Sequence, residues 1–426
     1  MPHKILIITY YWPPCGGAGV QRWLKFAKYL PQFGWEPFVL TVDPRFATYP
    51  ATDNTLEAEV AGKIKVYKTP AVNYFSLSGA RSLSGTKISA GFAAGEAKSF
   101  GSKVKKFVRG NFFIPDPRRG WNRYAYRKAL EIIKNEGIEY VITTSPPHST
   151  QLIGLRLKKK LQNLKWIVDF RDPWTDIYYY NMFHHTLPAL IIDRLYEKTV
   201  LKTADLVLTV GDSMAKLLRD KAEIPTDRVR VLTNGYDEAD FAGLKPSREE
   251  EDFIITYVGT ISGHYPLEGF LLSVRSLVDN FNKRIILKFV GHISEQQRSR
   301  ALAMMGKTNV QFIPYADHRE SIQHMLDSDI LLMVIPDHTR NRLIITGKLF
   351  EYLRTGNQIL CLGPPDGDAV GIIIEAGAGA TIQYNDIEEI TSFIKCVTKD
   401  RPSYSPPKLY NRMDITETLI NLLIEI

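Results

Sequence analysis

The side chains best suited to chemistry in the first half of the chain follow two short apolar runs. His148 ends a Ser-Pro-Pro-His segment after the run 140–143, and residues 169–175 read Asp-Phe-Arg-Asp-Pro-Trp-Thr after the run 166–169. An imidazole can donate to a sugar hydroxyl or a phosphate oxygen, a guanidinium can hold a phosphate in a two-bond fork, and a carboxylate can orient a hydroxyl. The residues predicted to be catalytic are His148, Arg171 and Asp172.

Glycine-rich turns offer a second kind of chemistry, the binding of phosphate by backbone N–H groups. One turn follows the first apolar run, and a similar turn opens the second half of the chain. Thr-Gly-Lys at 346–348 begins a helical pattern, where N–H groups, the helix dipole and an ammonium would act on one diphosphate. Glu351, one turn further on, could accept from a ribose diol. The predicted donor-binding residues are Gly17, Gly19, Gly259, Thr260, Thr346, Gly347, Lys348 and Glu351.

Each of these predictions has an alternative. His148 could be a structural histidine, Arg171 and Asp172 could pair only to shape their loop, and Glu351 could be a solvated helix carboxylate. The first glycine turn could be purely structural, or part of an NAD-binding fingerprint with Asp43 as the ribose ligand. Arg22 replaces the third glycine of that fingerprint, which argues against it.

The order of apolar runs and helical patterns predicts the framework that positions these residues. Continuous apolar strands that alternate with helices are typical of parallel sheets covered on both faces. The expected strands are 5–8, 36–42, 140–143, 166–169, 206–210, 254–258, 285–290, 310–313, 330–334, 358–362 and 380–383. The expected helices include 20–29, 123–136, 187–204, 213–222, 267–280 and 348–354. The fold class is therefore α/β, with two doubly wound, Rossmann-like domains.

Two domains also fit a length of 426 residues, which exceeds what one core usually organises. Strand signals stop near Val231 and restart near Ile254, so the charged segment 245–252 is expected to be the inter-domain linker. Asn234, in an Asn-Gly turn just before it, is expected to face the cleft between the domains. The predicted domains are 1–236 and 237–408.

The composition describes a globular chain with a modest excess of positive charge. Lysine plus arginine is 54 and aspartate plus glutamate is 46, and the resulting +8 fits an enzyme for an anionic ligand, an anionic membrane surface or an ordinary basic protein. Three scattered cysteines form neither a disulfide framework nor a zinc site, which indicates a reducing compartment. We expect neither a signal peptide nor a transmembrane helix, and hence a cytoplasmic protein.

One segment breaks the alternating pattern. Residues 98–113 interleave lysines and an arginine with bulky apolar side chains. A basic amphipathic helix of this kind suits the surface of a membrane that contains anionic lipid. The alternative is a helix that packs on its own domain and exposes a basic face to water.

Taken together, the motifs resemble those of GT-B glycosyltransferases of the family 4 type. The resemblance extends over nearly the whole chain and rests on the order of the motifs and on their placement at expected strand ends. The segments that carry it are 16–19, 114–121, 145–148, 169–174, 233–235, 257–260 and 347–352. It implies two Rossmann-like domains that face each other across a cleft, with the donor on the C-terminal domain and the acceptor near the N-terminal one. It also implies that a final helix, here 409–426, packs back on the first domain.

The resemblance assigns roles by position. Glu351 resembles the ribose-binding glutamate, the turn 346–348 resembles the phosphate-binding turn, and His148 resembles the histidine near the reacting sugar. Gly19 resembles the loop of the first domain that approaches the diphosphate. Residues expected at the acceptor or the cleft are Asp116, Trp174 and Asn234.

Two places depart from the family pattern. Leu343 stands where many members carry a glutamate eight positions before the ribose-binding one. Residues 262–264 stand where many carry an arginine and a lysine. The missing charge could come from Lys348, Arg340 or Arg342.

The resemblance implies a retaining transferase that needs no metal and uses a UDP- or GDP-linked sugar. Its acceptor would be lipid-linked or an oligosaccharide of the bacterial envelope, reached at the inner membrane, and neither a cofactor nor a nucleic acid is expected. An NAD-dependent oxidoreductase and a non-catalytic nucleotide-sugar binding protein stay open as other classes, since fold type alone does not separate them.

Overall fold

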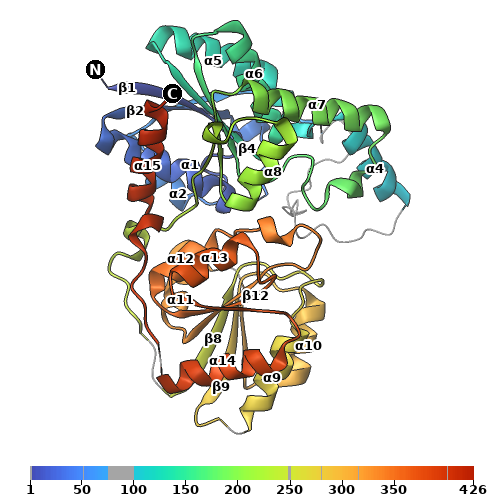
Figure 1. Ribbon diagram of the computed structural model, residues 1–426, viewed down its shortest axis with the longest axis vertical. Coiled ribbons are helices and arrows are strands. Elements are labelled where there is room, and N and C mark those ends of the chain that lie inside the picture. Colours follow the sequence, from blue (N-terminus) through green and yellow to red (C-terminus); the bar gives the residue numbers. More distant parts are fainter. Residues whose placement is uncertain are drawn as a thin grey trace. The chain divides into compact units, whose positions relative to one another are not determined.

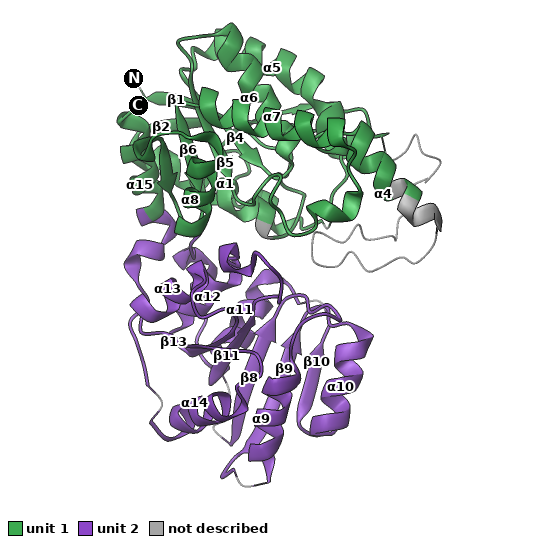
Figure 2. Ribbon diagram, turned by 45° about the vertical axis from the view of Figure 1, so that its right-hand side comes forward, with its two compact units in different colours: residues 1–233, 415–426 green, residues 234–414 purple. Residues whose placement is uncertain are grey.

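Two parallel sheets organise the chain in the computed structural model, one in each of two compact units (Figures 1 and 2). Unit 1 comprises residues 1–233 and 415–426, and unit 2 comprises residues 234–414. The structure describes residues 2–50, 52–74, 100–247, 251–279, 281–314, 316–400 and 402–426. Residues 98 and 99 of the basic segment 98–113 therefore lie outside the described residues. The prediction of two Rossmann-like, parallel-sheet domains is confirmed.

The sheet of unit 1 has seven parallel strands in the order β3-β2-β1-β4-β5-β6-β7. The strands are β1 His3–Ile8, β2 Trp35–Val42, β3 Lys65–Thr69, β4 Tyr140–Ser145, β5 Lys165–Phe170, β6 Leu206–Thr209 and β7 Val229–Val231. β4 pairs directly with β5 from Tyr140 to Ser145. The loops that follow these two strands, with His148 and Asp172, therefore begin side by side at one edge of the sheet.

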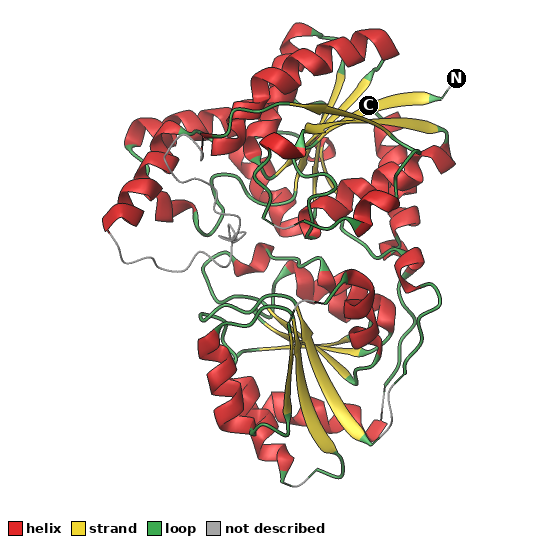
Figure 3. Ribbon diagram, turned by 180° about the vertical axis from the view of Figure 1, so that it is seen from behind, coloured by secondary structure: helices red, strands yellow, loops and turns green. Residues whose placement is uncertain are grey.

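Helices cover both faces of this sheet (Figure 3), which leaves strand residues such as Ile5 and Val168 fully buried. The helices of unit 1 that precede unit 2 in the chain are α1 Ala18–Tyr29, α2 Thr55–Ala58, α4 Phe100–Phe112, α5 Asn122–Glu136, α6 Gln151–Lys160, α7 Leu187–Thr203 and α8 Asp212–Ala222. The final helix α15, Arg412–Ile424, buries Leu419 and Leu423 in the core of unit 1. None of the described helices combines the length and hydropathy needed to cross a bilayer.

The sheet of unit 2 has six parallel strands in the order β10-β9-β8-β11-β12-β13. The strands are β8 Asp252–Val258, β9 Arg284–Val290, β10 Val310–Ile313, β11 Ile330–Val334, β12 Gln358–Leu362 and β13 Gly379–Ile382. The helices are α9 Glu268–Val278, α10 Glu295–Met305, α11 His318–Leu326, α12 Lys348–Thr355, α13 Asp368–Glu375 and α14 Ile387–Asp400. Leu332 and Met333 of β11 belong to two different core clusters, because successive strand residues point to opposite faces.

The charged segment 245–252 is not the connection between the units. Its described residues 245–247 and 251–252 belong to unit 2, where the backbone N–H of Ser247 donates to Asp327 (2.7 Å) and Gln323 donates to the carbonyl of Lys245 (2.8 Å). The chain passes from unit 1 to unit 2 at residues 233–234 and returns at 414–415. The sequence places these boundaries at 236–237 and 408–409. The charged composition of 245–252 suggested a linker, but polar side chains far along the chain, Gln323 of α11 and Asp327 after it, hold this segment in unit 2.

Candidate active site

His148 lies at the carboxyl end of β4, at the start of the short turn η5 (His148–Thr150). Its ring stacks on Trp174, with centroids 5.2 Å apart and planes inclined by 12°. Both ring nitrogens are shielded from solvent and have no hydrogen-bond partner among the described residues. Burial, with the nearby charges of Arg171 and Lys221, lowers the pKa of His148 to about 3, so the imidazole is neutral at pH 7.

A neutral imidazole without partners is suited to a substrate hydroxyl. One ring nitrogen can donate a hydrogen bond while the other accepts one. A buried polar group left unsatisfied costs about 1–3 kcal/mol, and native proteins keep few such groups. The environment of His148 therefore favours a functional interpretation over a purely structural one, although its role stays a prediction.

Trp174 supports His148 from the interior of unit 1. Its side chain is buried, and the indole N–H donates to Asp193 of α7 at 2.8 Å. The hydroxyl of Tyr180 donates to the other oxygen of Asp193 at 2.7 Å. Burial raises the pKa of Asp193 to about 6. These contacts fix the face on which His148 stacks, which makes Trp174 a positioning residue for His148.

Asp116 also acts on the His148 turn. Its carboxylate accepts from the backbone N–H of Ser149 (2.8 Å), from the Ser149 hydroxyl (2.9 Å) and from the backbone N–H of Arg118 (2.9 Å). It thus ties η4 (Pro117–Trp121) to η5. The sequence places Asp116 at the acceptor, and the structure shows it holding the turn that carries His148.

Arg171 and Asp172 occupy the neighbouring loop after β5 but differ in their contacts. The guanidinium of Arg171 donates to the carbonyls of Ser145 (3.1 Å), Pro146 (2.9 Å) and Gly19. These bonds join the first glycine turn to the His148 segment, so the geometry favours the loop-shaping interpretation of Arg171. Asp172 is partly exposed and has no hydrogen bond within the described part of the chain. Burial raises the pKa of Asp172, against the charge of Arg171.

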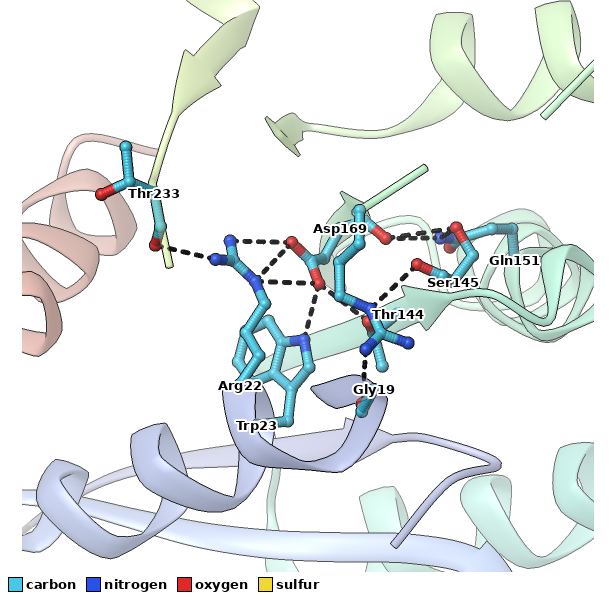
Figure 4. A network of polar contacts seen from close by, with 9 residues as sticks. Gly19, Arg22, Trp23, Thr144, Ser145, Gln151, Asp169 and Thr233 are labelled. Atoms are coloured by element: carbon cyan, nitrogen blue, oxygen red, sulfur yellow. Dashed lines mark hydrogen bonds and ion pairs between the residues drawn. The ribbon is translucent and has the colours of Figure 1, made fainter. Parts of the chain in front are cut away.

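A buried polar network that the sequence did not reveal braces this edge of the sheet (Figure 4). Arg22 and Asp169 are 1% and 0% exposed and form an ion pair at 3.0 Å. Asp169 also accepts from the indole of Trp23 and the hydroxyl of Thr144, both at 2.7 Å. Arg22 donates onward to the carbonyl of Thr233 at 2.9 Å. The arginine that occupies the place of the third fingerprint glycine is therefore a brace between α1 and the sheet.

Breaking this network is expected to destabilise unit 1. Asp169→Ala leaves the buried guanidinium of Arg22 without its counter-charge. Breaking a buried ion pair in this way lowers the free energy of unfolding by about 3–5 kcal/mol. Chemical or thermal unfolding followed by tryptophan fluorescence measures the loss. The control is Asp220→Ala, which removes an ion pair whose side chains are more than half exposed and should cost at most about 0.5 kcal/mol. Equal stabilities of the two variants would contradict the role given to Asp169.

The first glycine turn requires glycine at Gly17. Its φ of 93° is disfavoured for other residues, and a Cβ there would meet no atom within 4 Å, so the outer side of the turn is open. A Cβ on Gly19 would lie 3.3 Å from Arg171. Asp43, the ribose ligand of the NAD alternative, instead accepts from the backbone and side chain of Arg45 (2.9 and 3.0 Å). Neither Arg22 nor Asp43 therefore supports that alternative.

In unit 2 the structure brings Lys348 and Gly259 together. The ammonium of Lys348 lies 3.8 Å from the ring centroid of Tyr257, and a Cβ on Gly259 would be 3.1 Å from the Lys348 nitrogen. Gly259 has a φ of 124°, and Thr260 beside it is exposed. Burial lowers the pKa of Lys348 to about 7, partly offset by Glu351. No hydrogen bond or ion pair from the described residues reaches this ammonium.

This arrangement explains one departure from the family pattern. The Lys348 ammonium, one of three candidates for the charge that the resemblance expects after the Val-Gly turn, lies beside Gly259 of that turn. Arg342, another candidate for that charge, is paired with Asp366 at 2.9 Å on the surface. Thr346 and Gly347 close the turn before α12, with the carbonyl of Thr346 accepting from the N–H of Leu349 at 3.1 Å.

Glu351 lies on the first turn of α12, next to residues that sequence reasoning missed. Its carboxylate is 3.8 Å from the ring of His318, which is 3.3 Å from Asp240. Asn234 is the first residue of unit 2 and precedes Tyr236, whose backbone pairs with that of Asn411. No sequence signal links His318 with Glu351, because their helices are separated by β11.

A cavity of about 680 Å³ opens at the same edge of the unit 2 sheet, past the ends of β11, β12 and β13. Its lining mixes polar and apolar surface and includes Asp337, Asn341, Pro364, Pro365, Gln383 and Tyr384. The carboxyl ends of parallel strands form the usual ligand edge of an open sheet. Unit 2 thus presents the turns predicted to bind the donor and this cavity along one edge.

Comparisons with known proteins agree with these features. Residues 91–240 match the family described as Glycosyltransferase Family 4. No curated protein matches the sequence. Sucrose-phosphate synthase from Thermosynechococcus elongatus is similar in structure, with 13% identity, a TM-score of 0.62 and coverage of 100% of this chain and 99% of that one.

Two further solved structures share the fold. The lipopolysaccharide outer core galactosyltransferase WaaB, in its apo form, has 11% identity and a TM-score of 0.58, with 99% of each chain covered. The MnaA–UDP structure from S. aureus has 14% identity and a TM-score of 0.52, with 99% of this chain and 96% of that one covered. At such identities the likeness establishes the fold alone. The chain therefore has the GT-B fold, and its residues 91–240 match glycosyltransferase family 4.

Proposed function

We propose that this protein transfers a sugar from a nucleotide-sugar donor to a membrane-associated or polysaccharide acceptor of the bacterial envelope, working on the cytoplasmic side of the membrane. The observation that carries the proposal is the Lys348 ammonium, which lies beside Gly259 without a hydrogen-bond partner among the described residues. A desolvated cation at a glycine turn and a helix start is suited to a diphosphate. The family match of residues 91–240 and the likeness to a structure solved with UDP support this assignment.

The donor is assigned to unit 2. Lys348 and the N–H groups at the turn 346–348 would hold the diphosphate of a UDP- or GDP-sugar, with Gly259 and Thr260 at its other side. Glu351 would accept hydrogen bonds from the ribose diol. As the bond between the anomeric carbon and the diphosphate breaks, negative charge grows on the leaving nucleoside diphosphate, and these groups stabilise that charge.

The reacting sugar and the acceptor are assigned to unit 1. His148 would hydrogen-bond the reacting sugar through its neutral ring, and Asp172 would orient the acceptor hydroxyl. The acceptor oxygen forms the new bond to the anomeric carbon, its proton is released, and the nucleoside diphosphate leaves. In our proposal the anomeric configuration is retained, and neither a metal nor a cofactor takes part.

Acceptor-dependent release of nucleotide tests the proposal. The full chain is incubated with UDP- or GDP-sugars carrying a radiolabel in the sugar, with and without a bacterial lipid or oligosaccharide extract. We expect free nucleoside diphosphate and labelled acceptor to form together. Binding of the donor without any release in every mixture would instead identify a non-catalytic nucleotide-sugar binding protein.

Glu351→Ala is expected to weaken nucleoside diphosphate binding by about 10–100-fold, because hydrogen bonds to a charged group contribute about 1.5–3 kcal/mol. Calorimetric titration measures this change. Glu389→Ala, which removes an exposed carboxylate from α14 of the same unit, should leave the affinity unchanged. An affinity of Glu351→Ala equal to that of the wild type would remove Glu351 from the donor site.

A further inference from the structure

Large exposed apolar side chains gather on two helices of unit 1. On α4 and α7 these side chains are between 38% and 70% exposed. Their spacing of three or four residues places each set along one face of its helix. Scattered exposed apolar residues are normal, whereas a contiguous group marks a binding surface. We define the docking face as Val104, Phe107, Val108 and Phe112 of α4 with Leu187, Ile191, Ile192 and Leu195 of α7.

Polar contacts fix the two helices side by side, as Figures 1 and 2 show. Asn111 of α4 accepts from the backbone N–H of Thr186 at 2.6 Å, at the cap of α7, and donates to the carbonyl of His184 at 3.1 Å. Gly110 approaches Phe183 so closely that a Cβ there would be 2.8 Å from its atoms. The C-terminal turn of α4 is thereby anchored beside the start of α7, and the two apolar stripes belong to one region of unit 1.

The charged side chains of α7 that reach the surface are basic, although Lys198 near the end of this helix pairs with the exposed Glu223 at 3.3 Å. The two carboxylates of α7, Asp193 and Glu197, are buried and turned inward, where they bind Trp174 and Thr175. Arg194 on the same helix is exposed. The sequence of α4 has no acidic residue and contains the basic residues Lys103, Lys105, Lys106 and Arg109. A surface that combines bulky apolar side chains with mainly basic residues is complementary to an anionic bilayer, whose headgroups are negative and whose interior is apolar.

We propose that the docking face binds the surface of a bilayer that contains anionic phospholipid. The eight apolar side chains enter the boundary between headgroups and acyl chains, and the exposed Arg194 interacts with lipid phosphates. The inference rests on the proposed function only where it identifies the acceptor as membrane-borne. The inner side of α7 holds Trp174, which stacks on His148, so one helix joins the docking face to the predicted catalytic turn.

Co-sedimentation of the full chain with vesicles tests the proposal. We expect binding to vesicles with about 30 mol% phosphatidylglycerol in phosphatidylcholine and much weaker binding to phosphatidylcholine alone. Raising the salt from about 0.1 M to about 0.5 M should weaken binding, because the Debye length shortens. The double variant Ile191→Asp/Leu195→Asp should reduce the partition coefficient by at least about 10-fold, since it places charge where apolar surface is buried.

Two controls separate the alternatives. Ile374→Asp alters a side chain of similar exposure (64%) on α13 of unit 2 and should keep vesicle binding. Nucleoside diphosphate binding should be unchanged in the double variant, which separates failure of docking from failure of the donor site. Equal sedimentation of the double variant and the wild type would overturn the proposal. A second result would also overturn it: the wild type does not bind vesicles, light scattering shows that it is a dimer, and the double variant is a monomer. The docking face would then be a self-association surface.

Discussion

His148→Ala is expected to lower turnover by roughly 10²–10³-fold while changing donor affinity by less than about threefold. The wild-type ring is neutral, stacked on Trp174 and without protein partners at either nitrogen, so its hydrogen bonds are available to the reacting sugar. Interactions that strengthen in the transition state affect the rate more than the binding of the ground state. Steady-state kinetics with nucleotide release as the signal, together with calorimetry of the nucleoside diphosphate, separates the two effects.

His148→Gln is the matched variant, because an amide retains a donor and an acceptor of comparable reach. It should recover part of the activity lost in His148→Ala. The melting temperature of both variants shows whether the stack on Trp174 still supports the turn. Activity of His148→Ala equal to that of the wild type would assign His148 to the scaffold, together with Arg171 and Asp116.

Lys348→Met is expected to weaken nucleotide-sugar binding by about 100-fold, because a charge-assisted contact to a desolvated diphosphate is lost. The wild type should also show a pH dependence that the variant lacks. The pKa of Lys348 in the free protein is about 7, so the ammonium loses its proton as the pH rises through 7, while a bound diphosphate needs the charged form. Affinity should therefore fall by up to about 10-fold for each pH unit above 7.

A nucleotide sugar is the appropriate ligand for this titration, because its diphosphate has no ionisation near pH 7 that would mask the lysine. Lys348→Arg keeps a charge that does not titrate, and its affinity should be independent of pH between 7 and 9. A wild-type affinity that is flat over this range would contradict the link between Lys348 and the diphosphate.

The strands that the sequence predicted best are those buried on both faces. The predicted run 358–362 has the same bounds as β12. A strand of a parallel sheet that is covered on both faces is a continuous apolar segment, so the sequence shows where it begins and ends. β3 at Lys65–Thr69 was missed. It is an edge strand, it contains Lys65 and Lys68, and its residues are mostly only partly buried. An edge strand with charged side chains has no apolar run by which to recognise it.

Some features of the candidate site could likewise be predicted from the sequence, and others could not. Gly259 and Lys348, each predicted to bind the donor, lie close together because both follow strands that are neighbours in the sheet. The hydrogen-bond partners of Arg171 are main-chain carbonyls. Every residue has such a carbonyl, so residue types and spacing could not predict these partners. The ion pair of Arg22 and Asp169 joins residues far apart in the chain, so only the folded sheet reveals it.

The central claim is that unit 2 binds a nucleoside diphosphate through Lys348. A thermal-shift screen of UDP, GDP and their sugar conjugates tests it most directly, since a ligand of the folded state raises the melting temperature by mass action. We expect one nucleotide series to raise the melting temperature of the wild type and to leave that of Lys348→Met unchanged. The absence of a shift with every nucleotide, or an equal shift in both proteins, would contradict this account.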